Sequence, residues 1–239
     1  MSAVPEWPLG LALMAHVLDR DLQRAARQAG GPAALWTAGP AQLRVWLNGG
    51  PGVVERALDC RVGFSAPRAR ERLATAGITH VWLGGPGYPA RLATVFDPPF
   101  GLFGTGAVVP ALAALDERPV IAVVGSRRPT GAGRRLAAEL AATLAERGAV
   151  VVSGLARGID AAAHEGALDA GGTTIAVLGS AVDRVHPRRN LALAQRIQAT
   201  GAVISEYWPG TVPSPWRFPA RNRIVAGLAH AVVLSLIHI

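Results

Sequence analysis

The sequence predicts an α/β fold in which a small all-helical segment precedes a doubly wound parallel sheet. Over residues 1–80, apolar residues recur at helical spacing between Gly- and Pro-rich turns. From residue 120 onward, short β-branched runs alternate with segments of helical pattern, and glycines separate them. Alternating strands and helices form parallel sheets with helices on both faces, so we expect this second region to be Rossmann-like.

The N-terminal domain is expected to span residues 1–80 and to consist of short helices. Apolar positions in residues 7–29 fall at helical spacing, and a Gly-Gly-Pro turn ends the pattern. Shorter helices are expected at 33–36 and 41–47, and Ser65 is placed to cap a helix that follows it. No pattern here indicates catalysis. A small helical docking module, of the helix-hairpin-helix kind, and a plain structural cap both fit.

A Gly- and Pro-rich connector, residues 81–119, begins the second domain. The run at 78–83 predicts a short strand. Gly104-Thr105-Gly106 is interpreted as a turn, because no helical pattern starts at it.

Residues 120–239 are expected to hold the sheet. The predicted strands are 120–124, 149–152, 173–178, 202–205 and 230–234. The predicted helices are 131–147, one that opens at 153–160 and runs to 170, 190–199 and 219–228. Ligands bind such sheets outside the carboxyl ends of the strands, so the loops that follow the strands are the candidate site.

Charge is concentrated in the second half of the chain. All 24 basic residues are Arg, which excludes a Walker-type phosphate loop with its Lys and any Schiff-base mechanism. Residues 1–117 hold 10 Arg and 9 acidic residues (net +1), and residues 118–239 hold 14 Arg and 7 acidic residues (net +7). A basic half favours a nucleic-acid partner, although arginines that merely solvate the surface would give the same count.

Other classes are disfavoured. The single cysteine, Cys60, excludes an intrachain disulfide, and the six histidines show no metal-binding spacing, so we expect no metal and no cofactor. The apolar stretches are short or broken by Pro and Gly, so neither a secretory signal nor a membrane span is expected. A cytoplasmic protein is the resulting expectation.

The segment 216–223 carries the most informative pattern. It interleaves Trp216 and Phe218 with Arg217, Arg221 and Arg223. Aromatic rings stack on unpaired bases while arginines neutralise phosphates, which is how proteins hold single strands without reading sequence. The alternative is that the rings anchor the core and the arginines form ion pairs. Because Pro disfavours a helical conformation in the residue before it, Phe218 is expected to lie in a loop.

Glycines mark two other strand-end loops. Gly125 opens the loop after the strand at 120–124, and Gly154 and Gly158 lie in the loop after the strand at 149–152. Glycine lets the backbone approach a ligand closely. Asp160 and His164 are spaced i, i+4 on the following helix, and local structural roles are expected for both rather than catalysis.

Several motifs, in this order, resemble the DNA processing protein A family. The resemblance runs from about residue 88 to residue 234, and the helical segment fits the family's small N-terminal SAM-like domain more loosely. The matching stretches are 88–92 (YPARL), 97–99 (DPP), 123–127 (VVGSR), 152–161 (VSGLARGIDA), 174–179 (TIAVLG), 204–207 (ISEY) and 218–228 (FPARNRIVAGL).

This resemblance implies a protein that binds single-stranded DNA, protects incoming DNA and loads a RecA-type recombinase in natural transformation, as a homodimer and without catalytic residues. It places the DNA at the strand ends. Gly125, Ser126 and Arg127 would grip a phosphate, and Phe218 would stack on a base. The remaining expected DNA-binding residues are Gly154, Gly158, Arg221, Asn222 and Arg223.

The chain departs from the family pattern at two places. Ser180 stands where the family usually has a second glycine after Gly179. The family also continues past the last predicted strand with further strand–helix units, whereas residues 235–239 match nothing in it. We therefore expect a truncated product whose strand at 230–234 is an exposed apolar edge.

Two other functions remain open. Related folds bind nucleotides at the same strand ends, so the chain is alternatively an enzyme acting on a nucleotide or nucleoside phosphate. Glu206 or Asp160 would then be its catalytic acid. A purely structural scaffold is the third interpretation.

Overall fold

The structure is a computed structural model that describes residues 5–235. Six short helices come first, and five of them have a proline in the first two positions, where the missing N–H costs nothing. They are α1 (Trp7–Leu18), α2 (Gln23–Gln28), α3 (Pro32–Thr37), α4 (Pro40–Trp46), α5 (Pro51–Val62) and α6 (Ala66–Thr75). Ser65 caps α6 as expected, its Oγ accepting a hydrogen bond from the Arg68 N–H at 3.5 Å.

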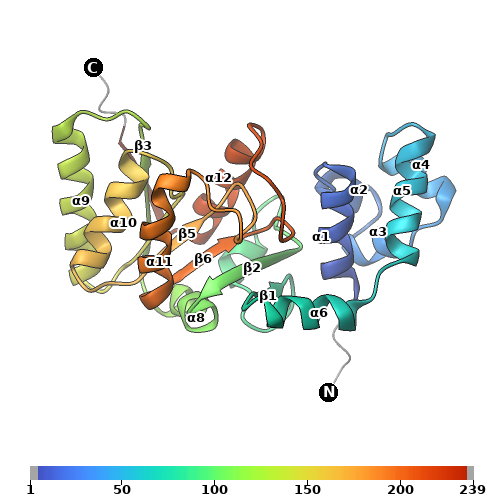
Figure 1. The fold of residues 1–239 in the computed structure, drawn as a ribbon, viewed down its shortest axis with the longest axis horizontal. Coiled ribbons are helices and arrows are strands. Elements are labelled where there is room, and N and C mark those ends of the chain that lie inside the picture. The colour runs from blue at the N-terminus through green and yellow to red at the C-terminus, as the bar shows by residue number, and fades with distance from the viewer. Residues whose placement is uncertain (1–4, 236–239) are drawn as a thin grey trace.

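Two details of this helical region differ from expectation. The pattern over 7–29 forms two helices instead of one, because Asp19 adopts a left-handed conformation (φ 49°) that ends α1. Helix α5 was not predicted. Figure 1 shows α1–α5 gathered beside the sheet, around their own apolar core. A second patch, which includes Leu9, Ile78 and Phe103, joins these helices to the sheet.

Seven strands form one sheet in the order β1-β2-β6-β5-β4-β3-β7. They are β1 (Thr79–Trp82), β2 (Gly101–Gly106), β3 (Val120–Gly125), β4 (Val150–Ser153), β5 (Thr174–Val177), β6 (Ala202–Ser205) and β7 (Ala231–Ser235). The sheet is mixed: β6, β5, β4, β3 and β7 are parallel, and β2 pairs antiparallel with both β1 and β6. The mostly parallel α/β fold is thus confirmed.

The prediction of a turn at Gly104-Thr105-Gly106 was wrong, because these residues lie in β2. Gly104 pairs with both Thr79 and Ile204. A side chain at Gly104 would lie 2.7 Å from Val108, so a glycine is needed where α8 (Val108–Glu117) packs on the strand. Glycine-rich composition resembles a turn in sequence, and only the two pairing strands reveal the extended conformation.

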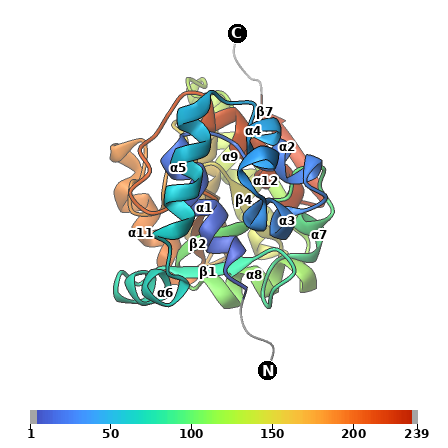
Figure 2. The ribbon, with the colours of Figure 1, turned by 90° about the vertical axis from the view of Figure 1, so that its right-hand side faces the viewer.

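Helices cover both faces of the sheet. On one face α9 (Gly131–Glu146), α10 (Ile159–Asp169) and α11 (Leu191–Thr200) bury alternate strand residues such as Val123, Val151 and Ala176. On the other face α7 (Ala90–Ala93), α8 and α12 (Arg217–Leu228) pack on Ala122, Val152 and others. Figure 2 views the molecule from the side of the helical region, with α1 and α5 in front of the sheet.

Strand β7 lies at one end of the sheet, as the sequence predicts for an exposed edge. Val232 is 50% exposed and Leu234 is 59% exposed. Of residues 235–239, which match nothing in the family pattern, 236–239 lie outside the described part of the chain. None of the helices within residues 5–235 combines the length and apolar character needed to cross a membrane.

Candidate functional site

The loops after β3, β4 and β5 meet the start of α12 at the carboxyl ends of the parallel strands. They enclose a hollow of about 280 Å³, which we call the strand-end pocket. Such a position, where helix N-termini and loop backbone converge, is where ligands bind sheets of this type. The pocket is lined by Arg127, Gly154, Ala156, Arg157, His186, Pro187, Arg189, Phe218 and Arg221.

Three arginines at this pocket face solvent without a carboxylate partner. Arg127 follows β3, Arg157 follows β4, and Arg189 lies in the 3₁₀ turn Arg188–Asn190 that precedes α11. All three are exposed, and within residues 5–235 no carboxylate oxygen lies within 4 Å of their guanidinium groups. Unpaired guanidiniums around one hollow create a strongly positive surface that suits a phosphate-bearing ligand.

Phe218 contributes a half-buried aromatic ring to the same pocket. Its ring centroid lies 5.6 Å from that of His186, and the Arg127 guanidinium carbon lies 5.5 Å from it. The expectation that Phe218 lies in a loop was wrong, because it is the second residue of α12. Pro219 is tolerated there because the first N–H groups of a helix have no intrahelical partner.

Arg221 points into the protein instead of into solvent. It is 4% exposed and donates hydrogen bonds to the Gly154 carbonyl at 2.7 Å and to the Val177 carbonyl. It thereby ties α12 to the carboxyl ends of β4 and β5. Burial lowers the pKa of the guanidinium, and Asp160 opposes that shift. The expectation that Arg221 adds phosphate-binding charge is therefore corrected to a structural role.

Asp160 fills the place where backbone N–H groups would otherwise meet an anion. Its carboxylate accepts a hydrogen bond from the Ala156 N–H at 3.3 Å, and the backbone of Gly125 and Gly154 also favours its ionised form. Burial raises the pKa of this carboxyl, while Arg221 and the backbone donors oppose the shift. An internal carboxylate thus satisfies the donors that bind phosphate in related folds.

His164, one helical turn beyond Asp160, has a separate structural role. It is fully buried, and its Nδ1 lies 2.7 Å from the Thr174 Oγ1. Because the Thr174 hydroxyl donates to the Val151 carbonyl, the imidazole Nδ1–H donates to Thr174. Burial lowers the pKa of His164 to about 3.

The glycines allow close approach of the chain itself. A side chain at Gly154 would strike the Arg221 guanidinium, and one at Gly125 would strike the Ser235 carbonyl. Gly158 has φ +85°, a conformation that favours glycine, and a side chain there would strike the Ser126 carbonyl. These glycines are therefore required by the packing of the chain itself, and their contact with a ligand stays a prediction.

Ser126 is likewise engaged within its own loop. Its N–H donates to the Ser235 carbonyl at 3.1 Å, and its Oγ accepts from the Arg128 N–H at 3.1 Å. These bonds hold the turn that projects Arg127 outward. Asn222 is exposed on α12 and lines a hollow that adjoins the strand-end pocket and reaches β7.

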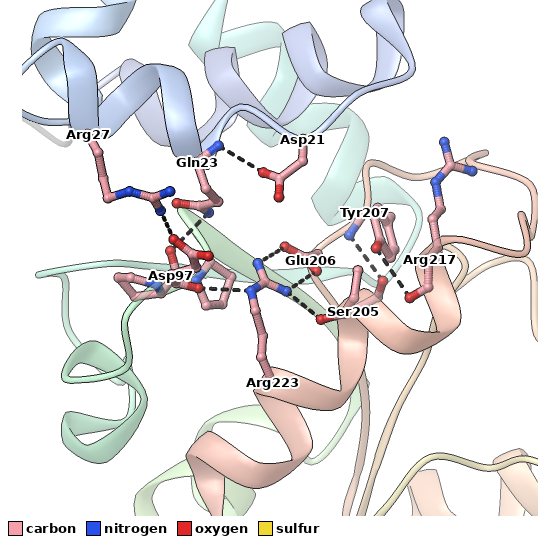
Figure 3. Close-up of polar contacts among 12 residues, drawn as sticks. Asp21, Gln23, Arg27, Asp97, Ser205, Glu206, Tyr207, Arg217 and Arg223 are labelled. Carbon is pink, nitrogen blue, oxygen red and sulfur yellow. Dashed lines mark hydrogen bonds and ion pairs between the residues drawn. The ribbon is translucent and has the colours of Figure 1, made fainter.

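Arg223 lies on a different side of α12, facing the helical region. Figure 3 shows its guanidinium between Glu206 and the backbone of Asp97. Both terminal nitrogens donate to the Glu206 carboxylate oxygens at 2.6 Å, and Nε donates to the Asp97 carbonyl at 2.9 Å. Glu206 raises the pKa of Arg223 above its ordinary value despite burial. The expected phosphate contact by Arg223 is thus replaced by an ion pair, and Glu206 is equally engaged.

Residues 79–236 match the DNA recombination-mediator protein A family. The chain belongs to this family. DNA processing protein DprA of Bacillus subtilis is 35% identical over 168 residues, which cover 70% of this chain and 55% of that protein. The chain spans about half the length, or less, of the curated relatives it matches.

Solved structures of this family share the fold. DNA processing protein A from Streptococcus pneumoniae superposes with a TM-score of 0.73 at 28% identity, covering 98% of this chain and 78% of that one. DNA processing protein A from Helicobacter pylori gives 0.58 at 32% identity, covering 66% and 68% respectively. The latter structure was determined to explain how that protein binds single-stranded DNA.

In this family member, the sequence did not predict three polar side chains of the strand-end pocket: Arg157, His186 and Arg189. Arg157 lies in the loop after β4, which was predicted to belong to the site, but only the glycines of that loop were predicted to bind the ligand. His186 and Arg189 lie beyond the Gly179-Ser180 turn, in the connection from β5 to α11. The available signal was their position after a predicted strand, combined with two consecutive arginines at 188–189.

Proposed function

We propose that this chain binds single-stranded DNA in the strand-end pocket and acts as a recombination mediator. The observation that carries the proposal is the convergence of Arg127, Arg157 and Arg189, each without a carboxylate partner, around the Phe218 ring. Guanidiniums contact successive phosphates, and an aromatic face stacks on a base whose partner strand is absent. The likeness to the Helicobacter pylori protein supports the same ligand.

Phosphate contacts would come mainly from these three side chains, with the Gly125-Ser126 turn and Asn222 at the rim. Gly154 and Gly158 would shape the floor, and Arg221 and Arg223 would act indirectly by fixing α12. We further propose that the chain protects incoming DNA, loads a RecA-type recombinase, forms a homodimer and is cytoplasmic; the description of the family as a recombination mediator supports the general role.

Binding is favoured over nucleotide chemistry by the state of the two candidate acids. Glu206 uses both carboxylate oxygens in its ion pair with Arg223. Asp160 is 5% exposed and is held by backbone N–H groups. A general acid or base needs a group within hydrogen-bond reach of the reacting atom, and both carboxylates are already committed.

Fluorescence anisotropy tests this function. A short labelled single strand should bind, and the same sequence as a duplex should bind more weakly because its bases cannot stack on Phe218. Three phosphate contacts predict a slope of log K against log salt of about −2, at roughly −0.7 for each phosphate neutralised. Equal affinity for strand and duplex, or a slope of zero, would contradict the proposal, and nucleotide hydrolysis by the same preparation would favour the enzyme.

A further inference from the structure

We propose that Arg217 is a positioning residue through which the docked helical region holds Phe218 in the DNA site. The inference rests on the proposed function. Arg217 and Phe218 are the first two residues of α12, and their side chains serve different neighbours. Successive residues of a helix point about 100° apart, at 3.6 residues per turn, so adjacent side chains reach different surroundings.

Arg217 is buried against the helical region. It is 5% exposed, and its Nη2 donates to the Asp19 Oδ1 at 2.5 Å, at the end of α1. Its Nη1 donates to the Val212 carbonyl at 2.5 Å. The guanidinium carbon lies 5.2 Å from the Tyr207 ring centroid and 5.1 Å from that of Trp216. The Arg217 side chain thus contacts both the loop 207–216 and the end of α1.

A second contact joins this loop to α1. The His16 Nδ1 lies 2.8 Å from the Thr211 Oγ1, five residues before the loop reaches Trp216. Burial, and next the nearby Arg217, lower the pKa of His16, while Asp19 opposes the shift. Because α1 is fixed by its own core and by the patch that includes Leu9 and Phe103, these contacts transmit its position to the loop.

Phe218 lies on a different side of the start of α12 from Arg217, so a contact that holds the helix start also holds Phe218. The ring and the first backbone atoms of α12 both lie against Gly179, where an added Cβ would lie 2.8 Å from the Phe218 Cδ1 and 3.3 Å from the Arg217 carbonyl oxygen. A shift of the helix start would move the ring away from His186 and Arg127, its partners in the strand-end pocket. DNA affinity falls in proportion to the fraction of molecules that hold the competent arrangement.

Two carboxylates offer a matched test. Asp19 and Asp169 have side chains 69% and 68% exposed, and each accepts a hydrogen bond from one arginine, at 2.5 Å from Arg217 and 2.6 Å from Arg196. Asp169 ends α10, away from the pocket. Asp19→Asn and Asp169→Asn each remove one negative charge, and long-range electrostatics alone would make both variants bind DNA slightly more tightly. Asparagine also tolerates the left-handed backbone at Asp19.

We expect Asp19→Asn to weaken single-strand binding about fivefold, the lower end of couplings between sites, against this electrostatic trend. Asp169→Asn should bind as the unaltered chain or slightly more tightly. In a Phe218→Ala background, Asp19→Asn should not weaken binding and should show only the slight electrostatic tightening, because no ring remains to be positioned. A general structural defect would instead weaken both backgrounds equally.

The outcomes separate the two claims. If the unaltered chain binds the strand and the two Asn variants match each other, the positioning role of Arg217 is overturned while DNA binding stands. An equal loss from Asp19→Asn with and without Phe218 overturns it as well. If the unaltered chain fails to bind, the proposed function fails and this inference fails with it.

Discussion

Two groups of arginines lie within the same half of the molecule and behave in opposite ways. Those in the loops around the strand-end pocket are exposed, and no carboxylate pairs with them in the described part of the chain. Those of α12 are buried or half-buried and bonded to carbonyls and carboxylates. The first group is Arg127, Arg157 and Arg189, and the second is Arg217, Arg221 and Arg223.

The difference shows that arginine supplies either charge or hydrogen-bond donors, according to its surroundings. At the carboxyl ends of parallel strands, some backbone carbonyls have no N–H partner in a neighbouring strand. The planar guanidinium of arginine has five N–H donors that can satisfy them. Arg221 satisfies two such carbonyls at once. The count of arginines in a segment therefore overstates the charge that a ligand would meet.

The largest effect should come from breaking the buried group. Arg221→Met keeps much of the side-chain volume but leaves two buried carbonyls without their donor, and it removes the positive charge that favours the ionised Asp160 carboxylate. We expect a loss of about 3–5 kcal/mol in the free energy of unfolding, as for other buried pairs that lose one partner. Urea denaturation measures it. Arg157→Met is the matched control, with a change below about 0.5 kcal/mol, and similar losses in both variants would erase the distinction between the groups.

Phe218 lies between the two groups, since its ring faces Arg127 and its backbone follows Arg217 in α12. Phe218→Ala should cost about 1–3 kcal/mol of single-strand binding through lost stacking and leave the salt slope unchanged. Phe96→Ala, which removes an 80% exposed ring elsewhere, is the control. A large drop in melting temperature with unchanged DNA affinity would instead assign Phe218 to the core.

Acidification should lower the stability of the fold through its buried histidines, whereas the exposed arginines stay charged. Burial lowers the pKa of His164 to about 3 and that of His80 to about 4, from 6.5. Below pH 6.5 the unfolded chain therefore binds more protons than the folded one, so stability falls as the pH drops from 6.5 toward 4. Each histidine contributes a slope of up to about 1.4 kcal/mol per pH unit.

Chemical denaturation across this pH range measures the slope. His164→Asn retains a donor for Thr174 and lacks the titrating ring, so its stability should depend less steeply on pH. An unchanged slope would show that other groups cause the acid sensitivity.

The smallest effect should come from single exposed arginines. Arg127→Ala should make the salt slope of DNA binding less steep by about 0.7, the share of one phosphate, without loss of stability. Arg147 is also exposed but caps the C-terminus of α9, so Arg147→Ala should leave the slope unaltered. Identical slopes in both variants would place the DNA elsewhere.

Much of the fold was predictable because its signals are local. The β-branched runs and the glycines that close each helix predicted β3 to β7 and most of the helices around them. Strand β2 was missed because its extended conformation depends on pairing with β1 and β6, which are distant in sequence. Helix α8 was missed inside the same Gly- and Pro-rich connector.

The site was predictable only in part, for the same reason. Arg127 and Phe218 do meet at the strand ends. The partners of the α12 arginines are the Gly154 carbonyl, 67 residues away from Arg221, and the Asp97 carbonyl, 126 residues away from Arg223. The alternative that these arginines form ion pairs was the correct one for Arg217 and Arg223. No local pattern distinguishes a guanidinium that finds a distant acceptor from one that stays free.

The close contact of Gly158 with the Ser126 carbonyl has a consequence for the cost of binding. The Ile159 N–H donates to the Ser126 carbonyl at 3.1 Å, and Gly158 packs against the same carbonyl, so opening either loop would break this contact. The protein side of the pocket is pre-organised, so little conformational entropy is lost there when a ligand enters. If the ligand is single-stranded DNA, as proposed, the ordering falls instead on the nucleic acid, whose backbone would adapt to a rigid surface. We then expect the ease with which the bases of a strand unstack to set which sequences bind most tightly.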